Sequence, residues 1–464
     1  MDKLSRIQSV FFQFFIITLF ICWSPVKVLA YIIPALYVAY IGFLLFFRPI
    51  LSVTQLILLF VWLSVITFSS LVNEDFVLQN AILSLITYGS AFLFFTIPSH
   101  KLNSPLLTKK VKKVLLILLA IQAPIGIVQG IYSGIKYGGF SGAAGDAVEG
   151  TIHLPLPTAA DFSNPIFTVG IILYLIYLIP YYPQLSFKSK ILIYAGVLSV
   201  ILASVLHVLL FSLAAIVAAY IFFAPGYIRL KPSVVIGTSI VFGTLIFIAF
   251  SLIGKNIKTT ANFVQDFIIG RNPKVKVINN IFNQGSYHYP QLHYIGLGPG
   301  QVNSRAALIG TEQYIGGFEN PRDLPLIEQK FTEPFNLLVK RQWENFTRLP
   351  ANLRSSTTAP FCSWISFYAE FGLFGFLVVI LSIVYYFFKE KIRAKTKQQK
   401  RRAFAFGSSV LLIFLLGIQE NYWEYAQIIF PAVMLIKIQQ GNLSGKDLTV
   451  EQSVTDRQPA PVKE

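Results

Sequence analysis

The chain has 464 residues, of which 55% are hydrophobic and 13% are charged, and its mean hydropathy is +0.63. This composition excludes a disordered chain and argues against a water-soluble globule, because soluble proteins carry about 25% charged residues. The net charge of +17 is compatible with nucleic-acid binding, but membrane proteins also collect Lys and Arg in their cytoplasmic loops. We therefore predict an all-helical protein that crosses a membrane many times.

Twelve apolar runs have about the length that a helix needs to cross a hydrocarbon core, which is about 20 residues. The run at 190–224 is too long for one span, so we divide it at a turn predicted between Ser204 and His207. The predicted spans are 9–24, 28–47, 51–72, 77–97, 114–132, 164–182, 190–205, 208–224, 233–253, 360–388, 403–419 and 422–440.

The distribution of positive charge gives the direction of these spans, because short loops rich in Lys and Arg stay in the cytoplasm. With both termini inside, the inside segments carry 24 of the 38 Lys and Arg, including the basic run at 389–402. The outside connections apart from the longest loop carry only Lys27 and Lys136. An even number of spans agrees with this charge pattern.

Two outside loops are long enough to hold a functional site, at 133–163 and 254–359. The second of these loops, the large loop, separates spans 1–9 at 1–253 from spans 10–12 at 360–440. A polar tail follows at 441–464, which we expect to be disordered. The large loop holds 12 Lys and Arg, and topology does not explain this excess of positive charge on the outside. Binding of an anionic ligand would explain this excess of positive charge, since Arg binds phosphate bidentately. The candidate arginines are Arg271, Arg305, Arg322, Arg341, Arg348 and Arg354.

The segment at 294–308 contains Gly296, Gly298 and Gly300 followed by Arg305. Spaced glycines are weak evidence for a nucleotide fold here, because no predicted strand and helix flank them. A tight backbone turn followed by a short helix is the better interpretation. That arrangement would hold Arg305 close to the membrane surface.

Span 10 carries a carboxylate near its outer end. Pro360 is placed to start the helix, and Ser363, Ser366 and Glu370 fall on one helical face. An ionisable group at this depth usually faces a protein interior or a watery cavity and marks a functional site. The alternative is a structural role, in which Glu370 caps a helix or pairs with an arginine. The sequence does not decide between the functional and the structural role.

The other polar candidates are His207 in the predicted turn and Asp146 and His153 in the first long loop. His207 is either a turn residue satisfied by backbone carbonyls or a group that projects into an outer cavity. The histidines show no metal-ligand spacing, so we expect no metal site and no cofactor. Cys22 and Cys362 lie far apart in apolar sequence and predict no disulfide framework.

These features together resemble the Wzy-type O-antigen and exopolysaccharide polymerases and the related O-antigen ligases. The resemblance rests on the layout of a dozen helices with a large outer loop before the last three, on GLGPGQVNSR at 296–305 and on FYAEFGLFGFL at 367–377. GDAVEGT at 145–151 and the SVLH turn also look like counterparts in polymerase-like members. The ligase branch normally has a His shortly before the Glu, where this chain has Phe361, and this departure favours a polymerase.

The resemblance implies a glycosyltransferase of the bacterial inner membrane. It would move a glycan from undecaprenyl pyrophosphate to a sugar hydroxyl on the periplasmic face, without a metal, and a chain-length regulator is a possible partner. Arg305 and Arg354, with Arg271 behind them, would bind the pyrophosphate. Base or sugar-positioning roles would fall to Asp146, His153 and Glu370, and Trp343 and several outer-loop tyrosines would stack on sugars. An O-antigen ligase and a flippase or transporter of lipid-linked glycans remain the alternatives.

Overall fold

The computed structural model describes residues 3–26, 29, 32–47, 53–89, 91, 99, 102, 104–137, 147–153, 163–223, 261–262, 264–313, 326–350, 354 and 358–444. Within these residues the protein is all-helical and contains no strand. The first half of the chain forms α1 (Lys3–Cys22), α2 (Ile32–Phe47), α3 (Val53–Val72), α4 (Leu78–Ser84), the π-helix η2 (Leu85–Gly89), α6 (Pro105–Lys136), η4 (Gly150–Ile152), α8 (Ser163–Leu178), η5 (Ile179–Gln184), α9 (Phe187–Ala203) and α10 (Leu206–Phe223). The second half forms α12 (Pro273–Asn280), η6 (Ile281–Gly285), α13 (Ser286–His288), α14 (Leu292–Ile295), α15 (Arg305–Gly310), α16 (Glu333–Leu338), α17 (Lys340–Thr347), α18 (Ser363–Arg393), α19 (Lys397–Leu416), η8 (Tyr422–Glu424) and α20 (Ala426–Ser444).

Four helices are long and apolar enough to cross a membrane: Pro105–Lys136, Asn164–Gln184, Leu206–Phe223 and Ser363–Arg393. Several shorter apolar helices accompany them, among them Ile7–Cys22 and Ile32–Phe43. Large apolar side chains face outward on many of these helices, and Leu71, Val128 and Ile221 are 75%, 64% and 73% exposed. Such an apolar exterior is unfavourable in water and suits lipid. The protein is therefore described best as a multi-pass membrane protein.

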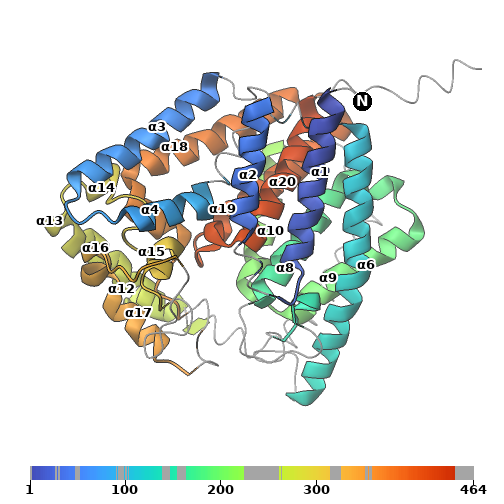
Figure 1. The fold of residues 1–464 in the computed structure, drawn as a ribbon. Coiled ribbons are helices and arrows are strands. Elements are labelled where there is room, and N and C mark those ends of the chain that lie inside the picture. The colour runs from blue at the N-terminus through green and yellow to red at the C-terminus, as the bar shows by residue number, and fades with distance from the viewer. Residues whose placement is uncertain are drawn as a thin grey trace, which may run out of the picture.

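Helix α20 lies at the centre of the helices around it, and every residue from 428 to 443 is buried. It packs against α1, α2, α8 and α19, which surround it in Figure 1. The rings of Phe430 and Tyr37 approach to 4.1 Å between centroids, and Trp23 donates a hydrogen bond to the hydroxyl of Tyr174 at 2.8 Å. Helix α20 thus contacts both α1 and α2 from the beginning of the chain and α8 from its middle.

The turn predicted between Ser204 and His207 is confirmed. Helix α9 ends at Ala203, Ser204 adopts a left-handed conformation with φ 49°, and α10 begins at Leu206. Residues with φ above zero end a helix because the chain can no longer make the next intrahelical bond. The two helices that follow and precede this turn therefore run as separate elements.

Helix α18 is broken at Gly372, whose φ of 65° and ψ of −174° are not helical. The break frees the carbonyls of Ala369 and Glu370, which accept hydrogen bonds from the N–H groups of Leu297 and Gly298, both at 2.9 Å. A Cβ at Gly372 would lie 2.4 Å from the carbonyl oxygen of Tyr294, so only glycine fits. The sequence predicted one continuous span from Pro360; instead a short helix from Ser363 precedes the break.

The short helices α12 to α17 form a second body beside the first part of α18, at the left and lower left of Figure 1. They share an apolar core that includes Val277, Leu297, Phe335, Trp343 and Phe361. The predicted large loop thus contains a helical unit, whose core also includes Phe361 and Ala369 from predicted span 10. It packs on α18 through α14.

The structure adjusts several predicted boundaries. A helix lies in eleven of the twelve predicted windows, and the window at 233–253 lies outside the described residues. Helix α6 begins at Pro105, well before the predicted 114, because Ser104 caps it through the N–H of Leu107. Helix α20 continues past the predicted end at 440 to Ser444, and the tail that we expected to be disordered lies outside the described residues from 445.

Candidate functional site

The glycine loop, residues 296–304, lies between α4 and α18. Gly296, Gly298 and Gly300 all have positive φ, between 74° and 97°. A Cβ at Gly296 would come within 2.3 Å of the Glu370 backbone, and one at Gly300 within 2.2 Å of the Asn80 carbonyl oxygen. Glycines are thus required for close backbone approach on both sides of the loop. The predicted tight turn and short helix are confirmed, because α15 starts at Arg305 directly after the loop.

Glu370 holds the glycine loop in place. Its carboxylate accepts hydrogen bonds from the N–H groups of Gly300, Val302 and Ser304 at 2.7, 3.2 and 3.1 Å. The side chain is fully buried. A carboxylate that is enclosed and bonded to several backbone donors satisfies otherwise orphaned N–H groups. Of the two roles that the sequence left open for Glu370, this geometry favours the structural one.

Arg305 is hydrogen-bonded to Glu424, in the segment between α19 and α20. The carboxylate of Glu424 accepts from the N–H groups of Arg305 at 2.9 Å and Ala306 at 3.3 Å, at the start of α15. The Arg305 guanidinium donates to the Glu424 carbonyl at 3.2 Å and lies over the Tyr425 ring at 4.8 Å. Arg305 is half-buried, so part of its side chain reaches the surface.

Glu420 and Lys274 form the buried part of the same site. Both are nearly inaccessible, and the electrostatic interaction between them favours the charged form of each. Tyr425 donates to the Glu420 carboxylate at 3.0 Å, and the Lys274 ammonium donates to the Ala359 carbonyl at 2.7 Å. Glu420 also interacts electrostatically with Arg305. One acidic side chain thus lies under the influence of two cations from the predicted large loop.

Burial dominates the protonation of Lys274, Glu420 and Glu424, which lie outside the four helices that are long and apolar enough to cross a membrane. It lowers the pKa of Lys274 to about 8, against the opposing effect of Glu420. It raises the pKa of Glu420 above its usual value, although Lys274 and the Tyr425 hydrogen bond oppose this. Burial, reinforced by the Glu370 charge, also raises the pKa of Glu424 to about 8. Groups with perturbed pKa values near neutrality are typical of functional sites.

His207 completes the site from the start of α10. Its Nε2 lies 2.9 Å from the Tyr422 hydroxyl, and the two rings stack with centroids 6.1 Å apart. The Lys274 charge also acts on the His207 ring. We call the whole set the polar cluster: Arg305, Lys274, His207, Glu420, Glu424, Tyr422 and Tyr425.

Of the three arginines predicted to bind pyrophosphate, only Arg305 belongs to the polar cluster. Arg354 donates to the carbonyls of Leu349 and Thr347 and so closes the end of α17. Arg271 is exposed and precedes the cap of α12, with its backbone N–H bonded to the Asp266 carbonyl at 2.8 Å. The expected convergence of these arginines on one point is therefore not seen.

Of the three remaining arginine candidates, two lie within the described residues. Arg341 and Arg348 are exposed, at α17 and directly after it. Arg322 lies outside the described residues, so its placement stays a prediction.

His153 belongs to a second polar group, within the described part of the first long loop. Its Nδ1 lies 3.0 Å from the fully buried Glu149 carboxylate. The Gln129 side chain accepts from the N–H groups of Glu149 and Gly150 at 3.0 and 2.8 Å and fixes the segment. This group is built on α6 and η4, not on the elements that carry Arg305. Asp146 lies outside the described residues.

Two further expectations concerned aromatic rings and metals. Trp343 was expected to stack on sugars, but it is buried and donates to the Gln313 side chain at 3.0 Å. Among the tyrosines of the large loop that the structure describes, Tyr287 and Tyr294 are exposed. Within the described residues no group of His, Cys, Asp and Glu is arranged to hold a metal ion. Cys22 and Cys362 are free and buried.

Sequence reasoning missed Glu420, Glu424, Tyr422 and Lys274. The first three lie in QENYWEY at 419–425, at the junction of two apolar runs that we had counted only as spans. Two carboxylates between apolar runs are a signal of the same kind as Glu370, because ionisable groups are costly there. Lys274 carried no sequence signal among the twelve cations of the predicted loop.

The polar cluster brings together a partly exposed arginine, a buried ammonium, two carboxylates and an imidazole. Cations of this kind stabilise a phosphate or diphosphate leaving group, and a carboxylate or imidazole accepts a proton from a hydroxyl. Comparison with known protein families, with curated proteins and with solved structures found no match.

Proposed function

We propose that the protein is a membrane glycosyltransferase that polymerises oligosaccharide units carried on a polyprenyl diphosphate. The proposal includes twelve spans with both termini in the cytoplasm, a bacterial inner-membrane location, and the polar cluster on the periplasmic side. One observation supports it above the rest: Arg305, Lys274, Glu420 and His207 gather at helix ends in a chain with an apolar exterior. Arg305 and His207 are partly exposed and so within reach of a lipid-linked substrate, whereas Lys274 and Glu420 are buried behind them.

In the proposed reaction the acceptor hydroxyl attacks the anomeric carbon of the donor glycan, and the bond from that carbon to the diphosphate oxygen breaks. Arg305 binds the diphosphate, because its side chain is partly exposed and its guanidinium is oriented by Glu424 and Tyr425. The buried Lys274 adds positive charge from beneath the surface. The proton of the hydroxyl passes to His207, which is partly exposed, and the polyprenyl diphosphate leaves as an anion.

A transporter of lipid-linked glycans is the second candidate, and the break in α18 favours it, because transporters often bind their substrates at broken helices. In this protein, however, the freed carbonyls of Ala369 and Glu370 are already bonded to Leu297 and Gly298. The break therefore holds the glycine loop. An O-antigen ligase remains the third candidate and differs only in the acceptor.

Reconstitution with a purified lipid-linked repeat unit distinguishes the three functions. We expect a ladder of longer glycans without an energy source. Movement of the unit across the bilayer without elongation would support a flippase, and transfer only to a second acceptor a ligase.

A variant links the activity to the polar cluster. His207→Gln should slow elongation and alter its pH profile, whereas His288→Gln, at an exposed position outside the cluster, should leave both unchanged. Elongation by His207→Gln with the wild-type rate and pH profile would remove His207 from the proposed reaction.

A further inference from the structure

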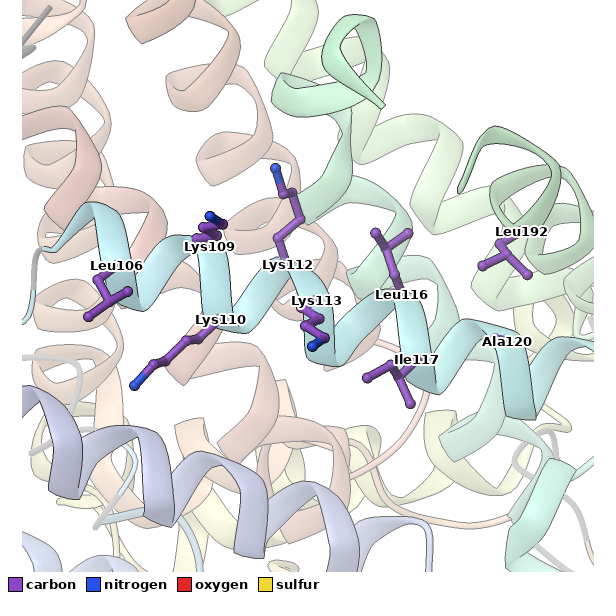
Figure 2. A pocket seen from close by; sticks show the side chains of 9 residues that line it. All are labelled: Leu106, Lys109, Lys110, Lys112, Lys113, Leu116, Ile117, Ala120 and Leu192. Carbon is purple, nitrogen blue, oxygen red and sulfur yellow. The ribbon is translucent and has the colours of Figure 1, made fainter. Parts of the chain in front are cut away.

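A groove of about 600 Å³ lies along the first half of α6, far along the chain from the polar cluster. Figure 2 shows the four lysines next to Leu106 in one half of the groove, and the other apolar side chains in the other half. The lining residues come from α6, with one residue from α9: Leu106, Lys109, Lys110, Lys112, Lys113, Leu116, Ile117, Ala120 and Leu192. The groove thus has a cationic end and an apolar end.

The two ends follow from the helical repeat. Lys109, Lys113, Leu116 and Ala120 succeed one another at intervals of three or four residues, so they lie along one face of α6. Charge occupies the first turns of that face and apolar groups the next. The groove therefore runs parallel to the helix axis, from a polar to an apolar environment.

The lysines have no carboxylate partner within the described residues. Lys110 lies over the Phe12 ring and Lys112 over the Tyr181 ring, each with its ammonium 5.5 Å from the ring centroid. The neighbouring elements α1, α6, η5, α9 and α20 contain no Asp or Glu. Cation–π contacts orient these side chains but leave their positive charge uncompensated.

The position of the lysines matches the level of lipid headgroups. Residues from Val114 to Ile135 carry no charge and span about 33 Å at 1.5 Å per residue. A hydrocarbon core is about 30 Å thick, so the lysines lie at its edge when this segment crosses it. The apolar end of the groove, from Leu116 to Ala120, then lies within the hydrocarbon.

We propose that this groove binds one anionic phospholipid, with its phosphate on the lysines and an acyl chain along Leu116, Ile117, Ala120 and Leu192. Charge complementarity selects the anionic headgroup, and the apolar end selects a lipid over free phosphate. The site is independent of the proposed glycan chemistry, which uses other elements. By the positive-inside rule it lies on the cytoplasmic side.

The test is lipid retention measured by native mass spectrometry after extraction from nanodiscs containing equal amounts of phosphatidylglycerol and phosphatidylcholine. The first variant replaces Lys109, Lys110, Lys112 and Lys113 with Gln. Its matched control replaces Lys395, Lys397, Lys400 and Arg401 with Gln, which removes the same charge from another basic segment. We expect the wild type and the control to retain phosphatidylglycerol. The amount of phosphatidylglycerol retained by the first variant should be lower by at least about tenfold.

A second variant keeps the charges and fills the apolar end. Ala120 is exposed, so Ala120→Trp should fold normally and still displace the acyl chain, with a similar loss of phosphatidylglycerol. Equal retention by wild type, Lys variant and Ala120→Trp would overturn the proposal. An equal loss of phosphatidylglycerol in the control would show that the effect arises from general surface charge, and it would overturn the proposed site. Displacement of the lipid by inorganic phosphate at equimolar concentration would overturn the assignment of a lipid as the ligand.

Discussion

Glu424 and Arg305 bind each other in both directions: the Glu424 carboxylate accepts from the Arg305 backbone N–H at 2.9 Å, and the Arg305 guanidinium donates to the Glu424 carbonyl at 3.2 Å. This reciprocal contact joins two segments 119 residues apart in the chain. It orients the one predicted phosphate ligand that belongs to the polar cluster. The first prediction therefore concerns this arginine.

Arg305→Ala should reduce glycan elongation about 100-fold, which is the usual effect of removing one preorganised charge or donor from a transition state. Arg305→Lys should keep part of the activity, because it retains the charge but loses the planar fork. The measurement is the rate of ladder formation in proteoliposomes. Arg341→Ala, at an exposed arginine of α17, serves as the control and should match the wild type.

Glu370→Gln should destabilise the protein by about 2–5 kcal/mol, because one of two acceptor oxygens becomes a donor facing the N–H groups of the glycine loop. The thermal unfolding midpoint in detergent should fall together with the activity. A variant that keeps its wild-type midpoint and loses only activity would restore Glu370 to the list of catalytic residues.

Gly372→Ala should prevent normal folding, at a cost above about 3 kcal/mol, because positive-φ strain adds to a clash with the Tyr294 carbonyl. Gly270→Ala is the matched control, since Gly270 also has positive φ but a Cβ added there would meet nothing within 4 Å. That control should cost only about 1–2 kcal/mol. Expression level and unfolding midpoint measure both, and equal behaviour of the two variants would contradict the steric explanation.

Lys274→Met and Glu420→Gln should each destabilise the protein, because each leaves the other ionisable group buried without its partner. The double variant should be more stable than the sum of the two losses predicts, by about 0.5–3 kcal/mol. Unfolding midpoints of the four proteins give this coupling energy. Strict additivity would show that the two groups do not interact in solution.

The contribution of Glu424 to stability should fall as pH rises from about 5 to 8, by up to about 1.4 kcal/mol per pH unit. Its pKa is raised to about 8 in the folded state, so the folded state holds a proton that the unfolded state releases near its ordinary pKa. Above pH 8 both states are ionised and this contribution no longer changes. Lys274 is protonated in both states below about pH 7 and adds a contribution that rises with pH only above that, because its folded-state pKa is lowered to about 8.

Thermal unfolding of Glu424→Gln between pH 5 and 9 checks the last prediction. The variant should show a shallower decline than the wild type below pH 8. Glu328→Gln, which removes a mostly exposed carboxylate, should follow the wild type. A variant slope equal to that of the wild type would show that Glu424 does not titrate in this range.

Much of the helical layout was readable from the sequence, because an apolar run bounded by charge or a turn can satisfy its backbone in lipid only as a helix. The Ser204 turn and the glycine turn before Arg305 were readable for a similar reason, since local backbone chemistry specifies them. The break at Gly372 was not. A glycine in an apolar run is compatible with a continuous helix, and only the contact with Tyr294 and the glycine loop decides otherwise.

The site divides in the same way. Residue chemistry alone selected Arg305, Glu370 and His207, because charge and imidazole beside apolar spans are rare. Tertiary structure decided that Glu370 holds a loop, that Arg354 closes a helix, and that Lys274 meets Glu420 from 146 residues away. Electrostatic partners are set by distances in space, and the order of residues along a chain does not encode which distant charges meet.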